Sequence, residues 1–405
     1  TCLQDEVFHV PQAQAFCDGR WSEWDPMITT FPGMYFVSVA LSKGAQRLGM
    51  NWGCSIPELR ASSVMSAILC VGVMMWVKIR RDRAIDWGVL WPIVIAALWP
   101  PLSLSSFLYY TDAPALLWIL LCYACSLGRR GSLPPSWQLW ISAAIGVVAI
   151  GMRQTNAVWV AFVAADVLGR ARGESNGGVL GLLQWMVSHW RKVLVLVGGY
   201  GVVLGWFVWF VIQNGGVVMG DKERHVPVLH FAQLGYVSGV LGVVALPYVP
   251  SIRVHWVMLG VLVIFMACCI EYGTHAHPFV TDDNRHYIFY LWRRVIAPLG
   301  PILAPVYAVG AYFSASTLLL SSPPSTLFAF CVAIFLSLVP TALPEPRYFT
   351  PAVVFFLLLI PGRRSNLVLA TTLTLAVALA SIICVLVFLF RPFRWHDGSV
   401  ARFLF

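Results

Sequence analysis

The chain has 405 residues, of which 59% are hydrophobic and only 11% are charged. Soluble domains carry roughly 25% charged residues, so this composition excludes a single water-soluble core and indicates an integral membrane protein. The formal charge of +9 comes from 27 basic residues that are scattered singly or in pairs. Such scatter excludes the basic stripe of a nucleic-acid-binding surface.

The first 32 residues are polar and rich in aromatics, and the apolar stretch after them is too short to span a bilayer. Lys43 and Arg47 in that stretch favour a helix lying in the membrane interface. We therefore expect residues 1–57 to form a structured first loop with its own interfacial helices. Because the chain opens in polar sequence, we also expect a spanning helix or signal anchor upstream of Thr1.

Apolar runs long enough, or nearly long enough, to cross a bilayer follow along the chain. We expect twelve of them, at 58–79, 88–107, 113–127, 138–151, 156–169, 193–213, 230–249, 254–270, 293–316, 326–342, 347–361 and 366–389. Several are rich in Pro and Gly, as in WPPLS and APLGPILAP, which predicts tilted, broken or re-entrant helices. With no internal repeat and no soluble segment, the sequence predicts an all-α polytopic membrane protein with a single domain over residues 1–405.

The loops between these runs predict the orientation. If residues 1–32 lie outside, the clustered arginines of KIRRDR, GRRGSLPPS, GRARGE and PGRRSN fall on the cytosolic side, as the positive-inside rule requires. Of the 18 Asp and Glu residues, only Asp82, Asp86, Asp166 and Glu174 then face the cytosol. The chemistry is therefore expected at the lumenal face.

Most of the ten cysteines lie in apolar runs, where they serve as small hydrophobic residues. Cys2, Cys17 and Cys54 lie in polar sequence, where one disulfide is possible in an oxidising compartment. The sequence leaves the pairing open.

The first loop contains two clusters of carboxylates and aromatics, DEVFH from Asp5 and WDPMITTFPGMY from Trp24. Aromatic faces next to carboxylates suit sugars, whose CH faces stack while their hydroxyls need acceptors. The alternative is that Asp5 and Glu6 only cap a helix and that the tryptophans belong to an interfacial belt. We favour a functional role for the Asp5–Glu6 pair and the belt for Trp21.

Two further motifs, YYTD ending at Asp112 and RQTN beginning at Arg153, lie at the outer ends of apolar runs. An ionisable residue there is costly unless it faces a polar cavity, so Arg153 is a functional candidate. The alternative is that the Arg153 side chain only extends toward lipid headgroups.

Cationic groups near aromatics occur in GDKERH, with Lys222, and in TDDNRHY, with Arg285 and His286. Such donors suit a lipid-linked phosphate at the interface. PEPRYF places Glu345 and Arg347 between two apolar runs, where an internal ion pair alone would also satisfy them.

A metal site is conceivable because His275, His277, Asp282, Asp283 and His286 crowd one loop, but their spacing matches no standard zinc or calcium pattern. No Walker loop, dinucleotide fingerprint, GxSxG or HExxH occurs. The energy for any reaction must therefore come from an activated substrate or a gradient.

Taken together, DEVFHVPQAQAFCDG, WDPMITTFPGMY, LYYTD, RQTNAVW, GDKERH, HPFVTDDNRHYIFYLW, PEPRYF and RPFRW resemble, in order, the endoplasmic-reticulum α-1,2-glucosyltransferase family that uses dolichyl-phosphate glucose. The resemblance implies a GT-C glycosyltransferase fold with about 12 to 14 transmembrane helices. It also implies inverting transfer of the terminal glucose onto a diglucosylated dolichyl-pyrophosphate oligosaccharide, at the lumenal face of the endoplasmic reticulum.

By this resemblance Asp5 is the expected catalytic base and Glu6 the alternative, while Arg285, His286, Arg347 and Lys222 are expected to bind the donor phosphate. Sugar or acceptor contacts are expected from a further set: Gln12, Trp24, Asp25, Tyr110, Asp112, Arg153, Gln154, Asn156, Asp221 and Glu345. No metal or other cofactor is expected, because these cations can stabilise a leaving phosphate. The implied partners are the two dolichol-linked substrates and membrane lipid, and the protein is expected to be a monomer.

Two alternatives remain open. A secondary transporter would also place charged residues in broken helices, although it predicts polar residues near the middle of the spans. The other alternative is a sibling GT-C enzyme that uses mannose phosphate. Physical reasoning from the residues does not distinguish mannose from glucose, and only the resemblance favours glucose.

Overall fold

The structure, a computed structural model, describes residues 5–129, 132–173, 178–394, 398 and 400–404. Cys2, Glu174 and parts of the GRRGSLPPS and RPFRW motifs lie outside these residues. The described chain is helical apart from a two-stranded antiparallel sheet of β1 (Phe393–Arg394) and β2 (Val400–Ala401).

Six helices within the described ranges are long and apolar enough to cross a membrane: Ile56–Asp82, Trp190–Asn214, Ala232–Ser251, Trp256–Gly273, Tyr287–Leu319 and Leu367–Phe390. They coincide with six of the expected runs and confirm an all-α multi-pass architecture. The remaining expected runs form shorter helices, so the total of 12 to 14 spans stays a prediction.

Two Pro- and Gly-rich runs are broken, as predicted. The run at 88–107 divides into α4 (Trp87–Ala97) and α5 (Pro100–Ser105) around the Trp99–Pro100–Pro101 sequence, because proline removes a backbone donor and clashes with the preceding turn. The run at 293–316 is interrupted at Gly300, whose φ is +46°, before α16 (Ala304–Leu319).

Contacts divide the chain into two compact units. The first comprises Thr1–Arg80 and Ser105–Val226, and the second comprises Arg81–Leu104 and Pro227–Phe405. The single domain over residues 1–405 stays a prediction.

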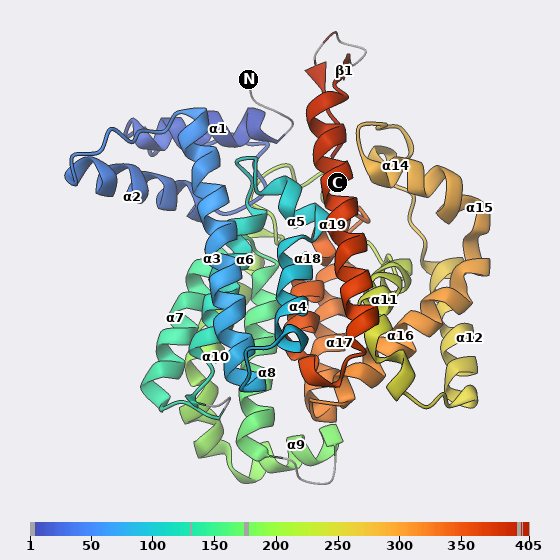
Figure 1. Cartoon of the computed structure of the whole chain (residues 1–405). Helices are drawn as coiled ribbons and strands as arrows, with labels where there is room; N and C mark the ends of the chain where they lie inside the picture. The colour runs from blue at the N-terminus through green and yellow to red at the C-terminus, as the bar shows by residue number, and fades with distance from the viewer. Residues whose placement is uncertain (1–4, 130–131, 174–177, 395–397, 399, 405) are drawn as a thin grey trace. The chain divides into compact units, whose positions relative to one another are not determined.

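In the first unit, α1 (Glu6–Cys17) and α2 (Gly33–Arg47) lie crosswise to α3 (Ile56–Asp82) (Figure 1). Both helices fall within the expected first loop, and their position in the membrane interface stays a prediction. α2 packs on α7 (Ser136–Met152) through Gly33, where a Cβ atom would collide with the backbone of Gly151. Three further helices of this unit pack beside α7: α6 (Asp112–Cys125), α8 (Asn156–Arg172) and α10 (Trp190–Asn214).

One helix of this unit lies between the expected runs at 156–169 and 193–213. α9 (Gly178–Ser188) follows α8 and buries none of its residues. It lies at the opposite end of α3 and α10 from α1 and α2 (Figure 1). The apolar GVLGLLQWMV sequence explains a helix here, because exposed apolar residues on a short helix suit the membrane interface.

The second unit is centred on the packing of α11 (Ala232–Ala245) against α16. Gly242 and Gly310 let the two backbones touch, since a Cβ on either would meet the backbone of the other helix; close approach through small residues is typical of membrane helix pairs. The remaining elements are α12 (Trp256–Gly273), α13 (Pro278–Thr281), α14 (Tyr287–Leu291), α15 (Ala297–Leu299), α17 (Pro324–Leu338), α18 (Thr350–Leu359) and α19 (Leu367–Phe390), with short 3-10 or π turns between them.

Candidate active site

The two adjacent carboxylates at the start of α1 differ in environment. Glu6 is fully buried and accepts two hydrogen bonds from Arg60, Nε to Oε1 at 2.8 Å and Nη2 to Oε2 at 2.5 Å. The backbone N–H of Tyr109 also donates to Glu6 Oε1, at 2.8 Å. Glu6 therefore joins α1, α3 and the YYTD segment through a bidentate ion pair, the strong geometry for arginine and carboxylate.

Asp5 precedes the first residue of α1 and is only half-buried. Its backbone N–H donates to the Tyr110 hydroxyl at 3.3 Å, and its side chain makes no capping hydrogen bond to α1. The DE and YYTD motifs, about a hundred residues apart in sequence, thus lie together. Of the two carboxylates, Asp5 is the one within reach of solvent.

Two buried tyrosines support this end of the unit. The Tyr109 hydroxyl lies 2.7 Å from Ser38 Oγ, and the Tyr35 hydroxyl lies 2.6 Å from His9 Nδ1. Burial raises the pKa of both phenols above the ordinary value, so both stay neutral at physiological pH. The neutral Tyr35 hydroxyl can thus hold α1 to α2, and the neutral Tyr109 hydroxyl can hold the YYTD segment to α2, without adding charge.

The RQTN segment lies against the YYTD segment. Arg153 Nη1 donates to Asp112 Oδ1 at 2.8 Å, while Gln154 donates to the Thr29 carbonyl at 2.9 Å. Asn156 donates to the carbonyls of Ala115 and Ala149. Asp112 is 6% exposed, and its Oδ2 accepts no hydrogen bond from the described residues. A buried carboxylate oxygen without a partner is costly, which marks Oδ2 as a candidate acceptor for a ligand hydroxyl.

Gln12 and Asp25 meet within the first loop. The Gln12 amide donates to the Glu23 carbonyl at 2.7 Å and accepts from the backbone N–H of Asp25 at 2.8 Å. Gln12 therefore fixes the 23–25 segment to α1, and Trp24 in that segment contacts the rings of Phe16 and Tyr35.

The GDKERH segment is attached to the same loop. The backbone N–H of Asp221 donates to the Pro26 carbonyl at 3.0 Å, and Asp221 has a left-handed φ of +43°, which aspartate tolerates better than most residues. Lys222 Nζ donates to the backbone carbonyl of Asn214 at 2.5 Å. Lys222 thus also caps the C-terminus of α10, where a cation is favourable.

Arg285 and His286 lie in the second unit, around Asp283. Asp283 accepts from Arg285 Nη2 at 2.6 Å and from Arg285 Nε at 2.9 Å, and His286 Nε2 lies 3.7 Å from Asp283 Oδ2. Burial disfavours the charged form of Asp283, but hydrogen bonds from Arg285 outweigh it and hold the pKa of that carboxyl below its usual value. These contacts therefore keep the Asp283 carboxylate charged and hold its loop in place.

Glu345 and Arg347 form the internal ion pair considered from the sequence, with Arg347 Nε 2.5 Å from Glu345 Oε2. Glu345 is 7% exposed, and the Arg347 guanidinium also lies over the Tyr348 ring. The pair is thus held in place by Pro344 and Pro346 on one side and an aromatic ring on the other.

Two residues that sequence reasoning did not single out hold the chain just before this pair. Gln233 donates to the Leu343 carbonyl and to Thr341 Oγ1, and His230 Nδ1 lies 3.2 Å from the Ala342 carbonyl. Burial lowers the pKa of His230 to about 4, so it is neutral at physiological pH. The sequence signal for these two residues is a polar side chain at the start of an apolar run. This signal does not reveal which groups the side chain contacts.

The C-terminal residues support the Arg285 loop. The backbone N–H of Leu404 donates to the Arg285 carbonyl, and the backbone N–H of Tyr287 donates to the Leu404 carbonyl, both at 3.0 Å. Leu404 is buried, and Phe403 contacts the rings of Tyr287 and Tyr290. This contact too was absent from the sequence expectations.

The expected site residues therefore fall into two sets. Arg285, His286, Arg347 and Glu345 belong to the second unit, and all the others belong to the first. Among the described residues, no group of three or more His, Cys, Asp or Glu side chains is arranged to hold a metal ion; metal independence itself stays a prediction.

Comparison with known proteins adds the final line of evidence. The model of the DIE2/ALG10 family matches residues 1–358. The chain is 31% identical to a Dol-P-Glc:Glc(2)Man(9)GlcNAc(2)-PP-Dol alpha-1,2-glucosyltransferase of Arabidopsis thaliana, over 99% of this chain and 94% of that protein. It is 30% identical to a protein of the same name from Homo sapiens, over 99% and 92% of the two chains. For the protein of that name from Candida albicans the identity is 29%, over 87% and 83%.

No solved structure matches the chain. The family match covers most of the sequence, and the relatives align over nearly their whole length. The chain belongs to the DIE2/ALG10 family.

Proposed function

We propose that the protein transfers glucose from dolichyl-phosphate glucose to Glc(2)Man(9)GlcNAc(2)-PP-dolichol in α-1,2 linkage. The observation that carries the proposal is that relatives from a plant, an animal and a fungus bear this activity in their names at 29% to 31% identity. The transporter and mannosyltransferase alternatives are not favoured. Within this proposal the fold is of the GT-C type with 12 to 14 spans, and the site faces the lumen of the endoplasmic reticulum.

The reaction is a single displacement with inversion. The acceptor hydroxyl oxygen forms a bond to glucose C1, the bond from C1 to the phosphate oxygen breaks, and the hydroxyl proton passes to a carboxylate. Dolichyl phosphate leaves with the electron pair. This chemistry needs one base on the acceptor side and cationic stabilisation on the phosphate side.

Asp5 is the proposed base, and the environment of its neighbour supports this choice. Both carboxylate oxygens of Glu6 bond Arg60, and one of them also accepts from Tyr109. A buried carboxylate with both oxygens held by an arginine cannot approach a substrate without breaking that ion pair. Glu6 is therefore proposed to position α1, which presents Asp5.

The donor phosphate is assigned to Arg285, His286 and Arg347, with Lys222 in support. Each guanidinium already pairs with a carboxylate, Asp283 or Glu345. Such pairing fixes the orientation of a planar donor group before substrate arrives. These cations take the part that a metal plays in many phosphate-cleaving enzymes, so we propose a metal-independent reaction by a monomer.

Sugar recognition is assigned to residues of the first unit and to Glu345 of the second, with Asp112 as the best supported member. Its Oδ2 is buried and unpaired among the described residues, while Oδ1 is held by Arg153. One oxygen thus fixes the carboxylate and the other is available to a sugar hydroxyl. Trp24, Asp25, Tyr110, Gln154, Asn156, Asp221 and Glu345 complete the proposed set, and Gln12 acts through the 23–25 segment.

The test uses microsomes from cells that lack their own enzyme for this step and express the protein. They should convert diglucosylated lipid-linked oligosaccharide to the triglucosylated form with dolichyl-phosphate glucose alone. Transfer from UDP-glucose without formation of a lipid donor, or no product at all, would contradict the proposal.

A further inference from the structure

A wide pocket lies in the first loop, and its lining includes Gln12, Trp24 and Asp25 of the proposed sugar-binding set but not Asp5. It has a volume of about 920 Å³ and is open to solvent, a size within the range of small-molecule sites. Its walls come from the second half of α1, the 23–25 segment, the last turns of α2 and the segment at 53–55. We call it the loop pocket.

The lining of the loop pocket is polar in a particular way. It carries three carboxylates, Asp18, Glu23 and Asp25, against the single guanidinium of Arg20, together with the amides of Gln12, Gln14 and Gln46, two serine hydroxyls and the Trp24 indole. Excess negative charge repels phosphate and pyrophosphate. Carboxylates, amides and an indole suit neutral sugars, whose hydroxyls donate and whose CH faces stack.

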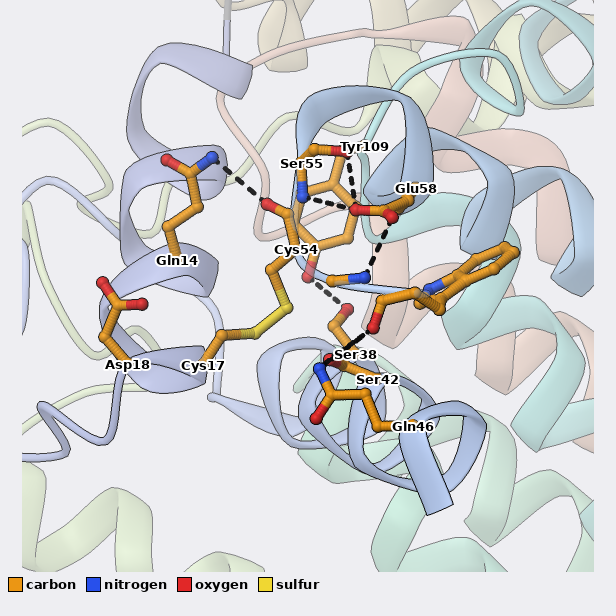
Figure 2. Close-up of a disulfide and its surroundings, with 12 residues drawn as sticks. Gln14, Cys17, Asp18, Ser38, Ser42, Gln46, Cys54, Ser55, Glu58 and Tyr109 are labelled. Atoms are coloured by element: carbon orange, nitrogen blue, oxygen red, sulfur yellow. Dashed lines mark hydrogen bonds between the residues drawn. A yellow bond between two sulfur atoms is a disulfide. The ribbon is translucent and has the colours of Figure 1, made fainter. Parts of the chain in front are cut away.

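The walls are held in place before any ligand binds. A disulfide joins Cys17 at the end of α1 to Cys54, and Gln14 donates to the Cys54 carbonyl at 3.1 Å (Figure 2). On the α2 side, Ser42 and Gln46 both donate to the Trp52 carbonyl. A rigid wall lowers the entropy that binding must overcome.

The loop pocket is also placed apart from Asp5 along one helix. The lining begins at Pro11, six residues after Asp5, which corresponds to roughly 9 Å along the axis of α1 at the ordinary helical rise. A ligand bound there is therefore too far from the base to be the reacting sugar. It can be a part of the same acceptor several sugars away.

We propose that the loop pocket binds the non-reacting hexoses of the acceptor oligosaccharide, an inference that rests on the proposed function. The acceptor carries far more sugar than the one that reacts. Binding its distant mannose residues lowers the acceptor KM without contributing to the displacement, so it selects the complete oligosaccharide over shorter ones.

The test compares two neighbouring exposed residues on α2. Gln46→Trp narrows the loop pocket, whereas Arg47→Trp puts the same side chain outside the lining. With the complete acceptor, Gln46→Trp should raise the acceptor KM about tenfold, which is the loss of one good contact, and leave the donor KM unchanged. With a lipid-linked acceptor that keeps only the glucose-bearing branch, Gln46→Trp and wild type should be equal.

An unchanged acceptor KM, or an equal effect of Gln46→Trp on both acceptors, would overturn the inference. The Cys17→Ser/Cys54→Ser variant should reproduce the selective loss, because it releases one wall.

A binding measurement separates this inference from the proposed function. Purified protein in nanodiscs is mixed with the delipidated Glc(2)Man(9)GlcNAc(2) oligosaccharide, and saturation transfer is recorded by NMR. Wild type and Arg47→Trp should transfer saturation to mannose protons, and Gln46→Trp should transfer much less. Absence of transfer in wild type would overturn the loop-pocket inference, whereas binding by a protein without transferase activity would contradict the proposed function alone.

Discussion

Asp5 and Glu6 are adjacent in sequence, yet Glu6 is fully buried and Asp5 is partly exposed. Asp5→Asn keeps the shape of the side chain and removes its ability to accept a proton. Turnover should fall by roughly 10² to 10⁴, the usual contribution of a general base, while donor binding and thermal stability stay as in wild type. The measurement is kcat alongside the unfolding temperature of the purified variant.

Glu6→Gln is the matched control, because it acts on the ion pair with Arg60. Loss of one partner from a buried pair costs about 3 to 5 kcal/mol of unfolding free energy. Glu6→Gln should therefore lower stability more than Asp5→Asn does. It should lower the turnover of the folded fraction less than Asp5→Asn does. A folded but inactive Glu6→Gln beside an active Asp5→Asn would reassign the base to Glu6. If both variants keep normal turnover, the first loop is not the catalytic one.

Arg347 should act on the donor. Arg347→Ala removes a charge-assisted contact to phosphate worth about 1.5 to 3 kcal/mol, so the KM for dolichyl-phosphate glucose should rise by roughly tenfold to a hundredfold, with partial recovery in Arg347→Lys. Arg364, which donates to the Leu320 carbonyl, serves as the control. Equal donor KM values in Arg347→Ala and Arg364→Ala would remove Arg347 from the phosphate site.

Among the elements, the C-terminal segment is the least expected support of the candidate site. Leu404→Pro deletes the backbone N–H that donates to the Arg285 carbonyl, whereas Leu404→Ala keeps that N–H and loses only the buried side chain. The donor KM should rise more in Leu404→Pro than in Leu404→Ala, with the acceptor KM unchanged in both. Equal donor KM values in the two variants would show that the backbone contact does not position Arg285.

Some elements could be predicted from sequence and others could not, for a physical reason. The breaks near Pro100 and Gly300 were predictable because Pro and Gly act locally on the backbone. The same local reasoning limited the disulfide to three cysteines, of which Cys17 and Cys54 pair. By contrast, α9 falls outside the expected runs, because its apolar stretch is too short to indicate a spanning helix.

The partners of polar residues were not predictable, because they are chosen by tertiary packing. Nothing near Glu6 in sequence indicates Arg60, which lies 54 residues away. In the same way the Gln12 amide, expected to face a sugar, is bonded to the backbone of residues 23 and 25. Motifs identified which residues gather, and the packing decides which of them remain available to a ligand.

For the whole molecule, the orientation in the membrane can be tested with engineered glycosylation sites. The sequence contains no Asn-X-Ser/Thr acceptor of its own, so an introduced one reports without background. An acceptor inserted next to Gly19, in the exposed turn after α1, should be glycosylated in microsomes, and one inserted next to Ser188, at the end of α9, should not. The reverse pattern would place the carboxylates of the first loop in the cytosol and exclude a lumenal site.

The most direct test of the central claim uses purified protein, synthetic dolichyl-phosphate glucose and Glc(2)Man(9)GlcNAc(2)-PP-dolichol in the presence of EDTA. NMR of the product sugar should show one new glucose in α-1,2 linkage on the terminal glucose, formed without metal or sugar nucleotide. A β-linked product, a requirement for added manganese, or no transfer from the lipid donor would contradict the account.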